Sequence, residues 1–191
     1  MSTQIARLPL TVLRAPCRAN CQFALHTRLL ACCLSAAACC LGTAARGADW
    51  PAYGADASRS CRTNEALKFP LEAAWAYVPA QPPRPAWPEP GKERHRLDFD
   101  YAPQPVMAHG LVYFGSSADD TVRALDAATG QVRWQFTTGG PVRFAPAIAG
   151  GKAYVVSDDG WLYALDAVTG MLVWKFRGAP RDDQILGNGR M

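Results

Sequence analysis

Acidic side chains form two adjacent pairs in the second half of the sequence. Asp119-Asp120 and Asp158-Asp159 each follow a short apolar run, and paired carboxylates can bind Ca²⁺ through their oxygens. The two pairs occupy the same place in two similar stretches of the chain, and a repeated acidic turn is better explained by hydrogen bonds to the turn's own backbone. We therefore expect these carboxylates to shape turns, with a calcium site as the weaker alternative.

Other residue types that could do chemistry lack partners at the required spacing. His95 and His109 are isolated from each other and have no partner at a metal-ligand spacing. The mixed charges of residues 94–100 lie in a proline-rich stretch, where a solvated loop is expected. The turn at 187–189 lacks the strand-to-helix context of a phosphate-binding loop. No residue is predicted to be catalytic, to bind a cofactor or to bind a metal.

The first 48 residues differ in composition from the rest of the chain. They hold five arginines, no acidic residue and six of the seven cysteines, and residues 29–41 form an uncharged apolar run before the small residues of GTAARGA. A basic start, a short apolar run and small residues are typical of a secretory signal peptide, which we predict for residues 1–48. An organelle transit peptide and lipidation at Cys32 are the alternatives. The apolar run is too short to span a membrane as a helix.

Removing this leader changes the electrostatics of the chain. The formal charge of +4 comes from 20 basic and 16 acidic residues, so without the five leader arginines 15 basic residues face 16 acidic ones, a charge of −1. This balance predicts no nucleic-acid partner. Only Cys61 then remains, which excludes a disulfide framework and leaves the redox state of this thiol open. We expect an exported protein of the periplasm or cell envelope.

The chain after residue 48 falls into segments that differ in proline content and in their runs of β-forming residues. Residues 49–78 form an N-terminal segment that ends in a possible strand near 71–78, and residues 79–101 form a proline-rich insertion that excludes regular helix and sheet. Residues 102–140 and 141–180 each contain four short runs of β-forming residues, and residues 181–191 begin a further unit. Four strands in about forty residues are typical of a β-propeller blade. The expected strands are 104–107, 111–114, 122–125 and 132–136, then 144–148, 153–156, 161–165 and 172–176.

One eleven-residue motif occurs in both stretches, as ALDAATGQVRW and ALDAVTGMLVW. Its glycine suits the positive-φ position of a tight turn, and its Asp and Thr can hydrogen-bond to free backbone groups in that turn. The Trp needs a different explanation, because a hairpin accepts any β-former there, whereas a large ring with an indole N–H suits contact with a neighbouring sheet. The shared positions are Ala124, Asp126, Thr129, Gly130 and Trp134, and Ala164, Asp166, Thr169, Gly170 and Trp174.

This pattern, A-x-D-x-x-T-G-x-x-x-W, resembles the tryptophan-docking motif of the PQQ-repeat, or quinoprotein-like, β-propellers. The resemblance covers about residues 102–178 and implies an all-β fold of four-stranded antiparallel blades in an eight-bladed ring, with each Trp packed on the next blade. DWPAYG at residues 49–54 resembles segments that begin such proteins after the leader. Trp75 looks like the docking Trp of an N-terminal strand that closes the ring, although no D-x-x-T-G precedes it.

Two blades do not close a ring. Eight blades need on the order of 320 residues, and only 143 of the 191 residues follow the leader. An uncovered blade face forfeits up to ~8 kcal/mol of apolar burial, which is comparable to the net stability of a domain. We therefore expect the chain to be part of a longer protein, with assembly of several chains into a ring as the alternative.

The resemblance implies two classes of function. Quinoprotein dehydrogenases of this family use PQQ and Ca²⁺, often with a vicinal disulfide against the cofactor, but Cys32-Cys33 and Cys39-Cys40 lie in the leader and are interpreted as apolar filler. The preferred prediction is a non-catalytic binding or scaffold module of the cell envelope without a cofactor, partnered by further blades or other envelope proteins. The propeller lipoprotein of the outer-membrane β-barrel assembly machinery is such a module. The alternative is the N-terminal part of a PQQ- and Ca-dependent alcohol or sugar dehydrogenase.

Overall fold

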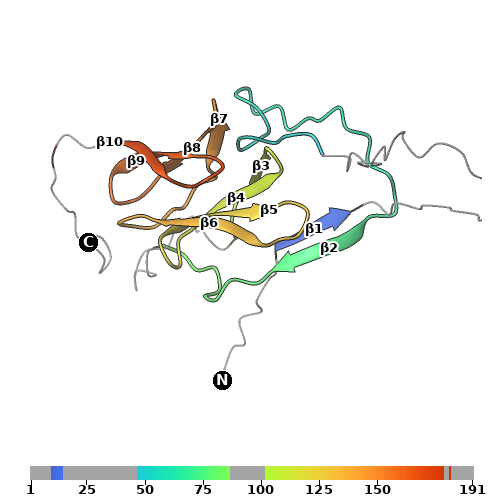
Figure 1. Ribbon diagram of the computed structural model, residues 1–191, viewed down its shortest axis with the longest axis horizontal. Helices are drawn as coiled ribbons and strands as arrows, with labels where there is room; N and C mark the ends of the chain where they lie inside the picture. The colour runs from blue at the N-terminus through green and yellow to red at the C-terminus, as the bar shows by residue number, and fades with distance from the viewer. Residues whose placement is uncertain (1–9, 15–46, 87–101, 179–180, 182–191) are drawn as a thin grey trace, which may run out of the picture.

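The computed structural model describes residues 10–14, 47–86, 102–178 and 181. Within these residues every regular element is a β-strand, and the strands form two four-stranded antiparallel sheets and one two-stranded sheet (Figure 1). The predicted all-β class is confirmed. In chain order the strands are β1 (Leu10–Arg14), β2 (Glu72–Tyr77), β3 (Val106–Ala108), β4 (Leu111–Ser116), β5 (Thr121–Asp126), β6 (Val132–Thr137), β7 (Ala147–Ala149), β8 (Lys152–Val156), β9 (Trp161–Asp166) and β10 (Leu172–Arg177).

The two four-stranded sheets share one topology. Their orders are β3-β4-β5-β6 and β7-β8-β9-β10, so each strand pairs with the next strand in the chain. The central registers match, because Leu111 pairs with Asp126 in the first sheet and Lys152 pairs with Asp166 in the second. The last hairpin of each sheet carries an irregularity close to its Trp. Two such four-stranded meanders are the predicted propeller blades.

The first strand of each sheet is shorter than the sequence predicted. The expected runs were 104–107 and 144–148, whereas β3 starts at Val106 and β7 at Ala147. Pro105 and Pro146 directly precede these strands, and a proline has no N–H to donate to a ladder. The other six blade strands lie where they were expected, extended by one or two residues.

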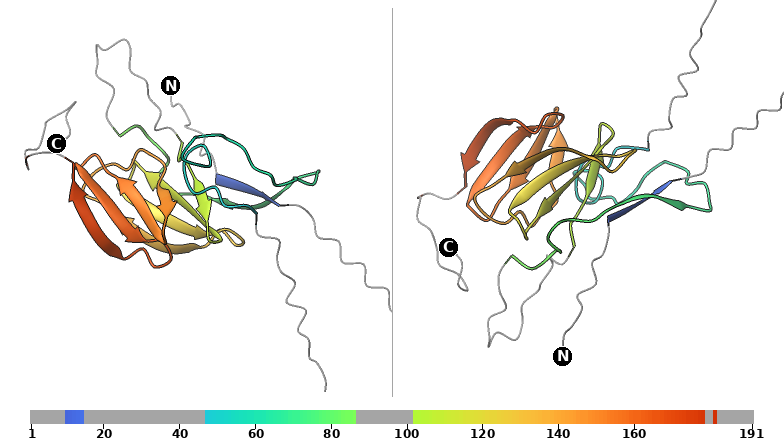
Figure 2. Two further views of the ribbon diagram at one scale, coloured as in Figure 1. Left: turned by 90° about the horizontal axis from the view of Figure 1, so that it is seen from above. Right: turned by 60° about the horizontal axis from the view of Figure 1, so that its bottom comes forward.

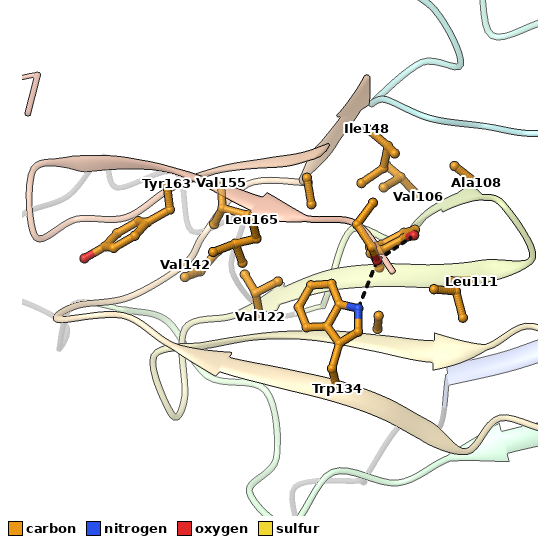
Figure 3. Packing of buried hydrophobic residues seen from close by; sticks show 14 residues of the cluster. Val106, Ala108, Leu111, Val122, Trp134, Val142, Ile148, Val155, Tyr163 and Leu165 are labelled. Atoms are coloured by element: carbon orange, nitrogen blue, oxygen red, sulfur yellow. Dashed lines mark hydrogen bonds between the residues drawn. The ribbon is translucent and has the colours of Figure 1, made fainter. Parts of the chain in front are cut away.

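The two blades pack face to face and share one hydrophobic core (Figures 2 and 3). Tyr113 and Val122 come from the first sheet and Leu165 from the second, and Val142 from the connection between the sheets lies among them. A Cβ added at Gly115 would lie 2.3 Å from Cγ1 of Val142. Gly115 therefore allows the connection to pass directly against β4, which keeps the interior densely packed.

The N-terminal segment links the inner strands of both blades. Trp50 exchanges two backbone hydrogen bonds with Met107 of β3, with N···O distances of 2.6 and 2.8 Å. The next carbonyl, that of Pro51, accepts a hydrogen bond of 2.7 Å from the N–H of Ile148 in β7. Trp50 and Pro51 thus hydrogen-bond to the edge strands β3 and β7 of the two sheets, and this fixes the distance between these two strands.

β2 lies on the side of the first blade opposite the second blade, and β1 runs antiparallel beside it (Figures 1 and 2). The strand predicted at 71–78 is therefore present. β1 was not predicted, and it falls within the 48 residues that we interpret as a signal peptide. That interpretation stays a prediction, because residues 15–46 lie outside the described ranges. In the part of the chain that the structure describes, no helix is long and apolar enough to cross a membrane.

Candidate functional site

The repeated motif forms the same turn in both blades. In the first blade, Oδ1 of Asp126 accepts hydrogen bonds from the backbone N–H of Ala128 and from both the N–H and the hydroxyl of Thr129, at 3.0, 2.9 and 3.1 Å. Gly130 has a φ of 73°, and its N–H donates to the carbonyl of Asp126 at 2.8 Å. The Asp126 carboxylate thus accepts three hydrogen bonds within the turn that joins β5 to β6.

The turn between β9 and β10 repeats this geometry. Oδ1 of Asp166 accepts from the N–H of Val168 at 3.1 Å and from the N–H and hydroxyl of Thr169 at 2.8 Å each. Gly170 again has a φ of 73° and donates to the Asp166 carbonyl at 2.8 Å. The motif alanines, Ala124 and Ala164, are fully buried on the strands before the turns.

These hydrogen bonds favour the ionised carboxylates. At Asp166, hydrogen bonds from the backbone and hydroxyl of Thr169 hold the pKa below its ordinary value. At Asp126, partial burial alone would raise the pKa, but the hydrogen bonds from Thr129 and Ala128 and the nearby charge of Arg133 outweigh it and lower the pKa. Both turns are therefore built around a charged acceptor.

The Trp of the first blade contacts the turn of the second. Its Nε1 donates to the carbonyl of Ala167 at 2.9 Å, and the hydroxyl of Tyr113 donates to the same oxygen at 3.1 Å (Figure 3). The ring of Trp134 lies so close to Gly170 that an added Cβ would stand 2.5 Å from Cδ2. Trp134 is only 8% exposed. The glycine therefore serves both the turn conformation and the approach of the ring.

Trp75 on β2 makes the same contact with the first blade. Its Nε1 donates to the carbonyl of Ala127 at 3.0 Å, and an added Cβ on Gly130 would stand 2.6 Å from Cδ2 of the Trp75 ring. β2 thus contacts the first blade as β6 contacts the second, even though no D-x-x-T-G precedes Trp75.

Trp174 has the same local setting as Trp134 but a different environment. The rings of Tyr154 and Trp174 lie 6.0 Å apart at 54°, and those of Tyr113 and Trp134 lie 5.9 Å apart at 55°. Trp174 is nevertheless 40% exposed, and Phe176 on the same strand is 62% exposed. The outer face of the second blade therefore carries an aromatic pair in the geometry that, in the first blade, donates two hydrogen bonds to one carbonyl.

A second set of contacts joins the β4–β5 and β8–β9 turns to segments that lie outside the strands. The hydroxyl of Ser117 donates to the carbonyl of Arg84 at 2.6 Å, and the Arg84 guanidinium donates back to the carbonyl of Ala118. In the second blade, the hydroxyl of Ser157 donates to the carbonyl of Gly140 at 2.9 Å. Sequence reasoning missed these contacts, although each serine opens an acidic turn and each acceptor precedes a proline.

A family model described as "Outer membrane protein assembly factor BamB" matches residues 75–191. This chain belongs to that family. The match includes both blades, both copies of the motif and Trp75, and the predicted resemblance to PQQ-repeat propellers is confirmed. No curated protein matches the chain.

Several solved structures resemble parts of this BamB-family chain. BamB from Moraxella catarrhalis is 28% identical over 36% of the chain and 21% of its own, with a TM-score of 0.34. A quinohemoprotein alcohol dehydrogenase from Comamonas testosteroni is 26% identical over 68% of the chain and 19% of its own, with a TM-score of 0.47. A europium-containing methanol dehydrogenase is 21% identical over 56% of the chain and 19% of its own, with a TM-score of 0.43. The chain thus spans about a fifth of the length of each.

One carboxylate of each acidic pair in this BamB-family chain joins a turn to the strand that follows it. Asp119 accepts from the hydroxyl of Thr121 at 2.7 Å and forms an ion pair with Arg123. Burial alone would raise its pKa, but these hydrogen bonds lower it. Asp159 takes the equivalent place in the second blade and accepts from the Tyr163 hydroxyl at 2.6 Å and the N–H of Gly139 at 2.8 Å.

The remaining candidates from the sequence are dispersed. Asp158 lies 3.7 Å from Arg143, and His109 occupies a positive-φ position in the turn after β3. Cys61 is exposed. Among the described residues, no three His, Cys, Asp or Glu side chains gather as a metal site would require. Residues 87–101 and 182–191 and the paired leader cysteines lie outside the described ranges.

Proposed function

We propose that this chain is an exported, non-catalytic binding or scaffold module of the cell envelope. One observation carries the proposal: the charged turn of each motif copy receives the Trp of a neighbouring sheet, Trp75 in the first blade and Trp134 in the second. The carboxylates of Asp119 and Asp159 are likewise engaged by donors of the fold. The family model's description as an outer membrane protein assembly factor supports the same class of function.

In this proposal the motif residues are docking residues. The Asp, Thr and Gly positions shape an acceptor turn, the alanine positions fill the strand beneath it, and the Trp of one sheet reaches the acceptor turn of the next. The outer face of the second blade then presents a docking Trp to a partner, either a further blade or another envelope protein. Its exposed side chains include Val156, Leu172, Trp174 and Phe176.

Cell fractionation and envelope assays test the proposal. The tagged chain should appear in the periplasmic or envelope fraction with its first 45 to 48 residues removed, which N-terminal sequencing measures. Loss of the protein should lower the amount of folded outer-membrane β-barrel proteins. A cytoplasmic location of the full chain, or unchanged β-barrel levels, would contradict the proposal.

A dye-linked assay tests the alternative enzyme class. The purified chain, supplied with PQQ and Ca²⁺ and offered alcohols or sugars, is expected to give no oxidation above a blank without protein. Oxidation that depends on both PQQ and the protein would replace the scaffold proposal with a quinoprotein dehydrogenase.

A further inference from the structure

The outer strand of the second blade holds two cationic side chains over one aromatic ring. Nζ of Lys175 lies 4.1 Å from the centre of the Trp161 ring, and Cζ of Arg177 lies 5.3 Å from it. Arg177 is opposite Trp161 in the register of β10 and β9, and its Nε also donates to the carbonyl of Arg181 at 3.1 Å. The face of a tryptophan ring attracts cations. Trp161 therefore brings two positive charges to one place, and these three side chains, Trp161, Lys175 and Arg177, form a cationic cluster.

The first blade has no such cluster at the same register positions. Its equivalent residues are Thr121, Gln135 and Thr137. The cation on this face of the first blade, Arg123, is buried and forms an ion pair with Asp119. Lys175 is exposed, and it forms no ion pair with any carboxylate in the part of the chain that the structure describes. The fold thus neutralises the cation in the first blade and leaves a positive charge open to a ligand in the second.

Asp159 is close to the cationic cluster in sequence but is occupied by neutral donors. Its Oδ2 accepts from the hydroxyl of Tyr163 at 2.6 Å and from the N–H of Gly139 at 2.8 Å, and its Oδ1 accepts from the N–H of Trp161 at 3.0 Å. Among the described residues it forms no ion pair. The Asp159 carboxylate therefore positions the backbone of Trp161 and does not pair with Lys175.

The cationic cluster faces away from the docking Trp of the same strand. Successive side chains of a strand point to opposite faces. Lys175 and Arg177 therefore share one face of β10, and Trp174 lies on the other. Tyr163, which pairs with Lys175 in the register, packs 5.5 Å from Phe136 of the first blade, so the cluster is on the side of the first blade. A partner that covers Trp174 leaves the cationic cluster open.

We propose that the cationic cluster binds an acidic peptide segment of another protein. Carboxylate side chains match the charges of Lys175 and Arg177, and the exposed part of Trp161 offers an apolar contact beside them. Anionic membranes attract clusters of about four to eight Lys and Arg, whereas this cluster has two cations and the chain without its leader has a net charge of −1. A peptide is therefore the occupant that the charges favour. The site deepens the binding function proposed above and rests on it.

Fluorescence anisotropy of a labelled peptide tests the site on purified residues 1–191. A short peptide of alternating Glu and Ser should bind saturably, and the same peptide with Gln in place of Glu should not bind. Lys175→Gln and Arg177→Gln should each weaken the binding about two- to fivefold, which is the range of exposed ion pairs. Lys68→Gln is the matched control, because it removes the same charge from the N-terminal segment, which lies away from β10 (Figures 1 and 2). Equal weakening by Lys68→Gln, or saturable binding of the Gln peptide, would overturn the proposal.

A Trp161→Leu variant tests the role of the ring. It keeps both positive charges but removes the aromatic face that holds them, so it should weaken peptide binding about two- to fivefold. Urea unfolding checks that the variant is folded. Unchanged affinity of the folded variant for the peptide would overturn the proposal.

Two measurements separate other occupants from the peptide. Vesicles of phosphatidylglycerol should bind more weakly than the peptide, and tighter vesicle binding that depends on Lys175 would overturn the proposal. Asp182 and Asp183 follow β10 in the sequence, and replacing both by Asn should leave peptide binding unchanged within about twofold at physiological salt. Any larger gain would assign the cationic cluster to the chain's own carboxylates and overturn the proposal. Export is measured separately by fractionation, so failure of this site and failure of export give different results.

Discussion

Replacing Gly170 by alanine should separate the two roles of the motif glycine. Gly170 has a φ of 73°, and an added Cβ would stand 2.5 to 2.8 Å from three atoms of the Trp134 ring. Alanine in the left-handed region costs about 1–2 kcal/mol, and forcing a methyl group into a packed contact costs a further ~1–3 kcal/mol. The expected loss is about 2–5 kcal/mol, a large part of the ~5–15 kcal/mol that stabilises a typical domain.

Gly160→Ala is the matched control. Gly160 has a φ of 85°, but no atom lies within 4 Å of its added Cβ, so this variant has the backbone strain without the clash. Urea unfolding followed by far-ultraviolet circular dichroism measures both losses. Gly170→Ala should lose ~1–3 kcal/mol more than Gly160→Ala. Losses equal within about 0.5 kcal/mol would refute the assignment of Gly170 to the docking of Trp134.

A double variant tests the same contact from the other side. Once Trp134→Ala has removed the ring, Gly170→Ala should cost only the backbone strain, about 1–2 kcal/mol. The two substitutions together should therefore cost less than the sum of the single losses. Additive losses would mean that Gly170 and Trp134 act independently.

Three further outcomes follow from the same geometry. Trp134→Phe should lower the free energy of unfolding by about 0.5–1.5 kcal/mol in urea unfolding, because the Ala167 carbonyl loses the indole donor but keeps the Tyr113 hydroxyl. Trp174→Phe on the exposed face should change it by less than about 0.5 kcal/mol. Folding lowers the pKa of Asp166 below its ordinary value of 3.8. Its stabilising contribution is therefore present above pH 3.8 and is lost as the pH falls through the folded-state pKa. Asp166→Asn should make the free energy of unfolding less dependent on pH in this acidic range. Burial raises the pKa of Tyr113 and Tyr163 from 10.0 to about 12. Their protonated forms therefore stabilise the fold fully below pH 10, and this contribution is lost as the pH rises toward 12. An ultraviolet titration should show both phenols ionising at higher pH than exposed tyrosines.

The strands of the two blades were predictable because local chemistry specifies their ends. Asp126 and Gly130 define one turn and Asp166 and Gly170 the other, so the strands before and after them follow directly. The starts of β3 and β7 were placed too early because the apolar pattern begins before Pro105 and Pro146. A proline does not interrupt an apolar sequence pattern, but it has no N–H to donate to a strand ladder, so the strand begins after it.

Contacts made by the backbone were not predictable. Trp50 and Pro51 link β3 to β7 through main-chain atoms, and Arg84 offers its carbonyl to Ser117. Any residue has these groups, so no side-chain pattern marks them. The pairing of β1 with β2 was missed for a related reason. The composition of the whole leader indicated targeting, and a strand of five residues changes that composition very little.

The Trp contacts run in one direction along the chain. Trp75 reaches the turn of the first blade, and Trp134 reaches the turn of the second, so each Trp donates to the sheet that follows it in sequence. The indole donor and the turn carbonyl that accepts lie on different surfaces of each blade. Contacts of this head-to-tail kind can continue from one blade to the next, whereas a symmetric contact would end with a pair of blades. The exposed Trp174 therefore continues the series. A partner that covers it in the same way has to offer what Gly170 and Ala167 offer Trp134: a position without a side chain beneath the ring and a carbonyl within reach of the indole N–H.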